Sequence, residues 1–264
     1  MFFTLNYIAM NKQSINKEAP AKDGKVTLVG FGPGNPDLLT IGGEKAITKA
    51  DIIFYDDLLD HDFLEQYSAE KIYVGKRKHR HSHEQDAINE LLLQAAKSGK
   101  QVVRLKGGDP MIFAHGGEEI AFLKTNGIEV SVIPGVSTAN AAASLTQIPL
   151  THRGVASSVA YITGHNSDIS LPKTDTLVCF MASSTIHRIA IKAIAEGRDP
   201  ETPVALIHNV SLPDQTEFLS TLNQLATSTT TYPTPLIIII GKVVSLKGFE
   251  TIQEFETNAI TCTS

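Results

Sequence analysis

The sequence predicts an α/β protein of two domains, with a parallel sheet in the N-terminal domain and a mixed sheet in the C-terminal domain. From Val26 onward, short apolar runs rich in β-branched residues alternate with helical stretches. The chain has 264 residues, enough for two cores of ordinary size. The connection between Ile162 and Leu177 has too little periodicity for a crossover helix, so we do not expect the second sheet to be purely parallel.

In the N-terminal half, strands and helices alternate regularly. The stretch 84–98 places Ile88 and Leu92 on one apolar stripe, and Gly99 then supplies a left-handed helix end. Strand–helix alternation of this kind implies right-handed crossovers over a sheet covered on both faces. The expected strands are 26–29, 52–55, 72–74, 102–105 and 130–133, and the expected helices are 84–98 and 117–126.

The C-terminal half has the same kinds of signal in a less regular order. Its expected strands are 159–162, 177–181, 204–207 and 236–240, and its expected helices are 185–196 and 216–226. A strand ends in a Pro-Gly turn at 134–135, which marks the expected domain boundary. The predicted units are a disordered polar tail (1–24), an N-terminal domain (25–134), a C-terminal domain (135–248) and a C-terminal extension (249–264).

Composition narrows the functional classes. The net charge of −5 argues against a nucleic-acid binder that works by global charge. No signal peptide is recognisable, and the longest later apolar run, 236–240, is too short to span a bilayer. Two cysteines in no spaced pattern suit a reducing compartment. We therefore expect a cytoplasmic protein without membrane or nucleic-acid partners.

Three glycine-rich turns each follow a predicted strand of the first half. They are 30–34 (GFGPG), 107–110 (GGDP) and 134–137 (PGVS). Ligands of open α/β sheets bind beyond the carboxyl ends of the strands, and glycine lets the backbone approach a ligand closely. One such turn alone would be read as a tight loop, but three in one sheet predict a small-molecule cleft.

The first of these turns does not complete a dinucleotide-binding fingerprint. Asn35 occupies the position of the third glycine, and Pro33 and Pro36 remove two amide donors that would otherwise face a pyrophosphate. A nicotinamide enzyme is therefore disfavoured.

Seven segments, taken in order, resemble the signatures of the tetrapyrrole methylases. They are VGFGPGNPDLLT (29–40), YDDLL (55–59), VGKR (74–77), VVRLKGGDP (102–110), GGEE (116–119), VIPGVS (132–137) and PLTHR (149–153). Each motif is modest by itself, but the set covers most of the chain, from about Val26 to Val244.

This resemblance implies a homodimeric methyltransferase that uses S-adenosylmethionine, releases S-adenosylhomocysteine, and methylates C2 and C7 of uroporphyrinogen III to give precorrin-2 for sirohaem and cobalamin. By motif position, Asp56 would accept the proton and Lys76 would donate one. The implied cofactor contacts are Pro33, Gly107, Gly108, Asp109, Ile112, Ser137, Thr138, Met181 and Val210.

A substrate with eight carboxylates needs cations in its site. Lys76, Arg77, Lys78 and Arg80 fall within five residues of one another, although Lys78 and Arg80 could equally be solvated surface charges. The residues expected to bind substrate are Arg77, Arg104, Lys106, His152 and Arg153. Two positions depart from the family pattern, because Asp57 and His115 stand where arginines are usual.

Several alternatives stay open at this level. A later corrin precursor such as precorrin-4 could be the substrate, and an RNA methyltransferase of similar fold or a non-catalytic binding module would be a different class. His79, His81 and His83 alternate as metal ligands on a strand would, but no carboxylate or thiolate lies nearby, so no metal is expected. The 24 residues before Lys25 are too few for the oxidase–chelatase domain of the fused sirohaem synthases, so we expect neither NAD-dependent oxidation nor iron insertion.

Overall fold

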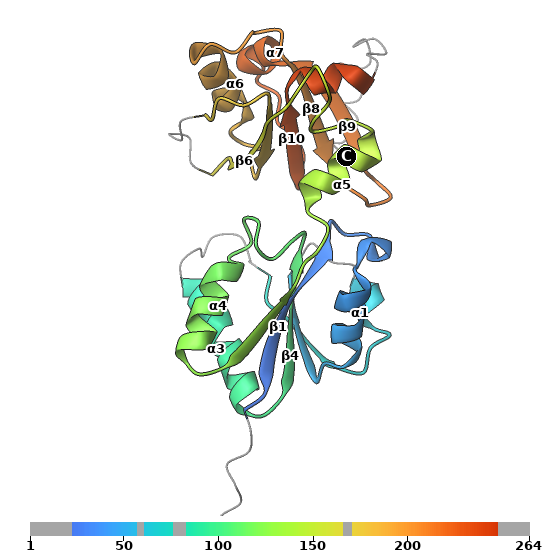
Figure 1. Cartoon of the computed structure of the whole chain (residues 1–264), viewed down its shortest axis with the longest axis vertical. Helices are drawn as coiled ribbons and strands as arrows, with labels where there is room; N and C mark the ends of the chain where they lie inside the picture. Colours follow the sequence, from blue (N-terminus) through green and yellow to red (C-terminus); the bar gives the residue numbers. More distant parts are fainter. Residues whose placement is uncertain (1–22, 57–60, 76–82, 166–170, 248–264) are drawn as a thin grey trace, which may run out of the picture.

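The computed structural model describes residues 23–56, 61–75, 83–165 and 171–247. These residues form two domains stacked end to end, each built around a five-stranded sheet (Figure 1). The predicted tail and the predicted C-terminal extension lie outside the described residues, apart from Asp23 and Gly24.

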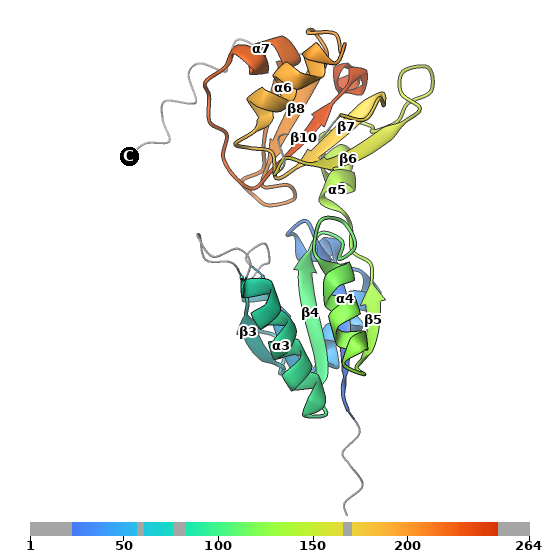
Figure 2. The same cartoon turned by 90° about the vertical axis from the view of Figure 1, so that its left-hand side faces the viewer.

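The N-terminal sheet is parallel throughout and has the strand order β3-β2-β4-β1-β5. Its strands are β1 (Lys25–Gly32), β2 (Ile52–Tyr55), β3 (Glu70–Tyr73), β4 (Gln101–Gly107) and β5 (Glu129–Ile133). Its helices are η1 (Pro36–Leu38), α1 (Ile41–Thr48), α2 (His61–Leu64), α3 (His83–Lys97) and α4 (Gly116–Thr125). Helices α3 and α4 cover one face (Figure 2), and α1 and α2 cover the other.

Both faces of this sheet are apolar because helices cover both. Leu28 and Phe54 pack with Leu92 of α3 on one face, while Val29 and Ile53 pack with Ile47 of α1 on the other. The continuous apolar runs of the sequence are thereby explained, and the predicted parallel sheet is confirmed.

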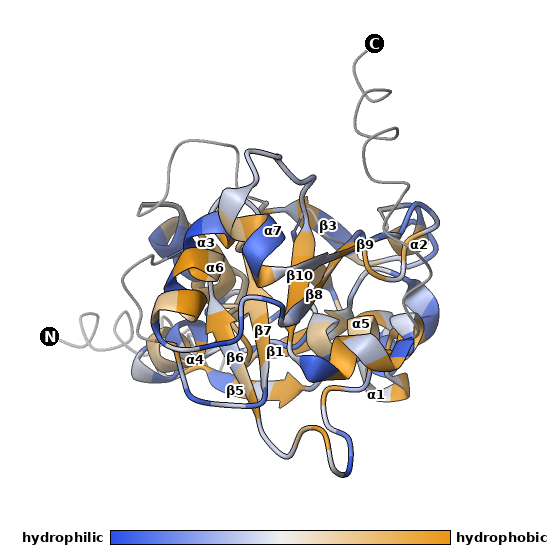
Figure 3. Ribbon diagram, turned by 90° about the horizontal axis from the view of Figure 1, so that it is seen from above, coloured by the Kyte–Doolittle hydropathy of each residue, from blue (hydrophilic) through white to orange (hydrophobic). Residues whose placement is uncertain are grey.

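The C-terminal sheet is mixed and has the strand order β6-β7-β10-β8-β9. Its strands are β6 (Val159–Thr163), β7 (Thr176–Phe180), β8 (Pro203–His208), β9 (Thr216–Thr221) and β10 (Leu236–Ile240). Its helices are α5 (Thr138–Thr146), α6 (Ile186–Ala195), α7 (Leu222–Thr227) and η2 (Lys242–Lys247). Seen from above, the hydrophobic strands β7 and β10 lie among the helices that cover them (Figure 3).

Two expectations for this domain need correction. The helix predicted over 216–226 is wrong, because Thr216–Thr221 pairs antiparallel with β8 as strand β9 and only then does α7 begin. Thr221 fixes that start through a capping box with Gln224. The mixed sheet itself is confirmed, but β6 and β7, the strands on which that expectation rested, are parallel. The antiparallel pairs are β7 with β10, β10 with β8, and β8 with β9.

The strand directions bring two sheet edges together. Strands β4 and β5 point toward the C-terminal domain (Figure 2), and the chain crosses between the domains from the end of β5 into α5. A second link is the amide of Asn35, which donates a hydrogen bond of 3.0 Å to Oγ of Ser211. Over the residues that the structure describes, no helix combines the length and apolar character needed to cross a bilayer.

Candidate active site

The three glycine-rich turns meet in direct backbone contact. The amide of Gly108 donates to the carbonyl of Gly32 at 2.7 Å, and the amide of Gly32 donates back to the carbonyl of Gly108 at 3.2 Å. A Cβ atom placed on Gly135 would lie 2.3 Å from the Gly108 carbonyl oxygen, and one on Gly30 would lie 2.4 Å from the Gly135 nitrogen. The predicted convergence of the turns is confirmed, and it depends on the absence of side chains at these positions.

Replacing Gly135 with alanine is expected to force the turns apart, because the contacting atoms belong to the backbone and cannot move aside. If the cofactor implied by the sequence binds here, its affinity should fall about tenfold or more. Calorimetric titration with S-adenosylhomocysteine measures the effect. Gly117→Ala is the matched control, because a Cβ there meets nothing within 4 Å. Equal affinities for the two variants would show that the close contact of the turns is irrelevant to the ligand.

Asp109 fastens the second turn to the third. Its Oδ2 accepts a hydrogen bond of 3.1 Å from the amide of Gly135, and its Oδ1 accepts one of 2.8 Å from the amide of Met111. One half-buried carboxylate thus caps two backbone donors and ties the end of β4 to the segment after β5. Ile112 follows within the same turn, with its amide bonded to the Asp109 carbonyl.

A cavity of about 1300 Å³ lies between the domains beside these turns. Four of the nine predicted cofactor residues line it, namely Pro33, Thr138, Met181 and Val210. Gly107, Gly108, Asp109, Ile112 and Ser137 do not line it directly. Two of them lie immediately behind its wall: a Cβ on Gly108 would lie 3.4 Å from Oγ1 of Thr138, and Ser137 caps the helix that Thr138 begins.

Much of the cavity wall belongs to the C-terminal domain, of which the sequence predicted three lining residues, Thr138, Met181 and Val210. Strands β6, β7 and β8 all end at this edge, and β10 begins there. The missed lining segments include Gly164–His165, Ser183–Thr185, Asn209, Ser211–Pro213 and Thr234–Ile237. A signal was present, since strand ends of a sheet gather at one edge, but the antiparallel return of β10 was needed to find it.

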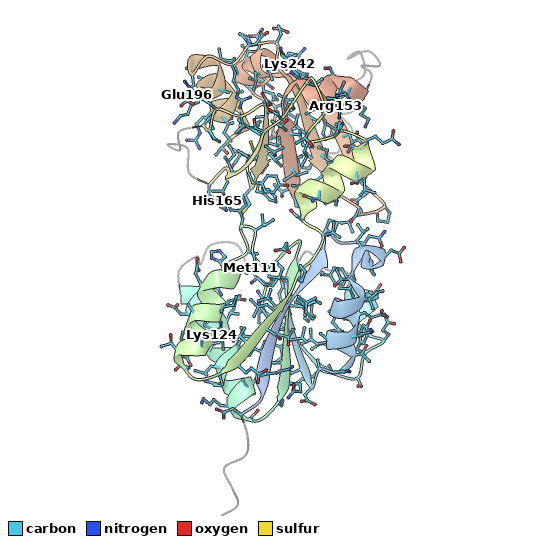
Figure 4. All side chains as sticks on the ribbon, viewed as in Figure 1. Met111, Lys124, Arg153, His165, Glu196 and Lys242 are labelled. Atoms are coloured by element: carbon cyan, nitrogen blue, oxygen red, sulfur yellow. The ribbon has the colours of Figure 1, made fainter. Side chains whose placement is uncertain are left out.

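Aromatic side chains of the two domains meet beside the cavity, at Phe180 of its lining. Phe113, from the turn after β4, has its ring centroid 5.1 Å from that of Phe180 at the end of β7. Phe180 in turn lies against Tyr161 of β6 at 5.8 Å. Met111 and His165 mark the two facing edges in Figure 4. The cavity is therefore walled by residues of both domains.

A group of four charges, three of them buried, lies at the carboxyl end of the N-terminal sheet. Nη2 of Arg104 is 2.8 Å from both carboxylate oxygens of Asp56. Oε1 of Glu119 accepts from Nζ of Lys106 at 2.7 Å and from Nε of Arg104 at 3.4 Å. The Arg104, Lys106 and Glu119 side chains are 3%, 4% and 0% exposed, whereas Asp56 is 31% exposed. Two cations and two anions balance, and only the Asp56 carboxylate reaches the surface.

This burial changes the interpretation of Arg104 and Lys106, which the sequence predicted as substrate contacts. Both cations are covered and engaged with carboxylates, so in this conformation neither can touch a substrate directly. Burial lowers the pKa of Lys106, and the neighbouring Arg104 guanidinium lowers it further, while Glu119 opposes both effects. The arrangement suits the support of Asp56 better than the binding of a substrate.

The other predicted substrate and proton-transfer residues are more dispersed. His152 and Arg153 are exposed in a turn of the C-terminal domain, and Figure 4 shows Arg153 away from the facing edges. Lys76, Arg77 and Asp57 lie outside the described residues. His115, in the position where an arginine was expected, is exposed and bonds Oε2 of Glu118 through Nδ1 at 2.9 Å.

The described residues offer little support for metal binding or for a cysteine nucleophile. Among the described residues, which leave out His79 and His81, no group of three or more His, Cys, Asp or Glu side chains could hold a metal ion. Burial raises the pKa of the Cys179 thiol to about 12, so this thiol stays protonated and is no nucleophile at neutral pH.

A match to a protein-family model shows to which family the chain belongs. The model of the tetrapyrrole (corrin/porphyrin) methylases matches residues 25–226, which span both sheets and the converging turns. The chain belongs to the tetrapyrrole methylase family. Within this family, it is 43% identical over 238 residues to a uroporphyrinogen-III C-methyltransferase of Methanocaldococcus jannaschii, covering 84% of this chain and 98% of that one.

Two further proteins are similar to this tetrapyrrole methylase, one in sequence and one in solved structure. A siroheme synthase of Psychrobacter cryohalolentis is 41% identical over 253 residues, which are 91% of this chain but 48% of the relative, so the chain spans about half the length of that enzyme. The crystal structure of a Thermus thermophilus uroporphyrin-III C-methyl transferase complexed with S-adenyl homocysteine has a TM-score of 0.74 and 36% identity. That comparison covers 84% of this chain and 100% of the other.

Proposed function

We propose that this tetrapyrrole methylase transfers methyl groups from S-adenosylmethionine to C2 and C7 of uroporphyrinogen III, giving precorrin-2 for sirohaem or cobalamin synthesis. The observation that carries the proposal is the backbone contact of the three glycine turns beside a large cavity between the domains. The named relatives of 43% and 36% identity support the same substrate and cofactor.

The residues present fit such a cofactor. The glycine turns lie next to a cavity of about 1300 Å³. Because glycine has no side chain, a flat nucleoside in this cavity can approach the backbone closely. When bound, S-adenosylmethionine supplies a methyl group that is already strongly electrophilic. The residues that would hold it are Pro33, Gly107, Gly108, Asp109, Ile112, Ser137, Thr138, Met181 and Val210.

Asp109→Ala tests this cofactor seat. The variant loses the hydrogen bond that ties the second turn to Gly135 and the one that it makes to Met111 within its own turn, and we expect the affinity for S-adenosylhomocysteine to fall about tenfold. The surface carboxylate of Asp23, which pairs with Lys97 at the far end of the sheet, gives a control variant, Asp23→Ala. An affinity unchanged by Asp109→Ala would remove this turn from the cofactor site.

A group of the protein must also accept a proton from the substrate, because methylation of a pyrrole carbon leaves positive charge on the ring system. In the proposal the half-exposed carboxylate of Asp56 accepts this proton, and Arg104 and Glu119 beneath it fix its orientation. Lys76, the proposed proton donor, and Arg77, a proposed substrate contact, lie outside the described residues. His152 and Arg153 stay proposed substrate contacts.

Some expectations remain predictions of the sequence. These are the homodimer, the cytoplasmic location, the absence of a nucleic-acid partner and the domain boundaries at 25–134 and 135–248. Sedimentation of the purified chain measures the first of them directly.

The decisive assay incubates the protein with uroporphyrinogen III and S-adenosylmethionine labelled in the methyl group. The expected product carries two labelled methyl groups and has the mass of precorrin-2. Transfer to a later precursor such as precorrin-4, without transfer to uroporphyrinogen III, would reject the substrate assignment and leave the methyltransferase class intact.

A further inference from the structure

The cavity between the domains has an unusual charge character for this chain. The protein carries a net charge of −5, yet no Asp or Glu is found among the described residues that line the cavity. The lining side chains that can carry charge are His165 and Arg188, both potential cations on the C-terminal wall. Such a cavity favours an anionic group.

Arg188 is the stronger of the two cations, because a guanidinium stays protonated at all ordinary pH values. It is the third residue of α6, and it is exposed. Across the described part of the chain, its guanidinium has no hydrogen bond and no ion pair. Arg198, beyond the end of the same helix, donates instead to the carbonyls of Pro172 and Thr174. One turn further along α6, Lys192 pairs with Glu196.

The surroundings of Arg188 suit a carboxylate. Ser183 and Ser184 line the same wall and carry hydroxyl groups that can donate further hydrogen bonds. Phe180 and Met181 add apolar surface beside them, which excludes water and strengthens a charge-assisted contact. A guanidinium binds a carboxylate through two parallel hydrogen bonds, a geometry that neither a hydroxyl nor a neutral imidazole can replace.

We propose that Arg188 is the centre of a carboxylate-binding subsite on the C-terminal wall of the cavity, with Ser183, Ser184 and His165 around it. This inference rests on the proposed function and deepens it. The carboxylate belongs either to the amino-acid end of the cofactor or to an acetate or propionate side chain of the substrate. Both sources share the same recognition chemistry, and one set of variants separates them.

The test compares wild type, Arg188→Gln and Arg188→Lys. Calorimetric titration without substrate measures the affinities for S-adenosylmethionine and for its decarboxylated analogue, and steady-state assays measure KM for uroporphyrinogen III. If the cofactor carboxylate is bound, Arg188→Gln weakens S-adenosylmethionine about tenfold and leaves the analogue unchanged. If a substrate carboxylate is bound, KM rises about tenfold and both nucleoside affinities stay constant. In either case Arg188→Lys, which keeps the charge but not the two-pronged geometry, recovers part of the loss.

Lys192→Gln on the same helix is the matched control, because Lys192 is not among the residues lining the cavity. Unchanged values for all three ligands in Arg188→Gln would overturn the subsite, and so would equal weakening of S-adenosylmethionine and its decarboxylated analogue. If the wild type transfers no methyl group to uroporphyrinogen III, the proposed function fails, but the two titrations still report on the subsite. A selective loss of S-adenosylmethionine affinity would then support the subsite, and no loss would reject it.

Discussion

Asp56→Asn lowers the turnover of methyl transfer by about a hundredfold or more, while the affinity for S-adenosylhomocysteine stays within about twofold of wild type. Asparagine keeps the shape of the side chain and can still accept a hydrogen bond from Arg104, but it cannot take up a proton. The carboxylate directly follows β2, outside the glycine turns and the cavity lining, so we expect the proposed cofactor site to be unaffected. Single-turnover transfer of a labelled methyl group, with excess enzyme, measures the chemical step directly.

The control for this experiment is Asp62→Asn, which removes an exposed carboxylate of α2 six residues further along the chain. Its turnover is expected to match that of wild type. A large loss of S-adenosylhomocysteine affinity in Asp56→Asn, or turnover close to the wild-type value, would contradict the assignment of Asp56 as the proton acceptor.

Glu119→Gln lowers the free energy of unfolding by about 3 kcal/mol, because it leaves two buried cations with too little negative charge. Glu119 is fully buried, and its Oε1 accepts from both Arg104 and Lys106. The amide of glutamine can retain one of these hydrogen bonds but does not neutralise either cation. Equilibrium unfolding in urea, followed by circular dichroism, gives the difference between the variant and wild type.

Glu118→Gln provides an unusually close comparison, since it makes the same change at the adjacent residue. The Glu118 side chain is 67% exposed and pairs only with His115 among the described residues, so we expect its loss to change stability by less than about 0.5 kcal/mol. Equal stabilities for the two variants would show that Asp56, Arg104, Lys106 and Glu119 do not act as a balanced group.

The sequence was a good guide to the sheets and a weaker guide to short helices. All nine expected strands are present, because buried parallel strands give runs such as Ile52–Tyr55 that are apolar on both faces. Strand β9 was missed, since its half-buried residues give only a weak alternation, and so was α5, a short run of alanines in which Asn140 and Ser144 give only a weak amphipathic pattern. Short elements of this kind depend on the packing of other elements against them, which the local sequence does not show.

The candidate site likewise contains some residues that the sequence predicted and others that it did not. The glycine turns could be predicted, because a turn whose backbone makes close contacts requires glycine, and glycine is visible in the sequence. The partners of Arg104 and Lys106 were not readable, since their pairing with Glu119 depends on how α4 lies over β4. Arg188 was missed for a similar reason: helix α6 brings it to the cavity, and no motif surrounds it.

The interdomain site is built from two surfaces of different character. On the N-terminal side, contact is made by peptide groups, whose shape is the same whatever side chains surround them. On the C-terminal side, the wall consists of side chains such as Arg188 and Met181. Substitutions can therefore change what the C-terminal wall recognises, whereas the peptide groups opposite keep their shape in every variant that retains the glycines.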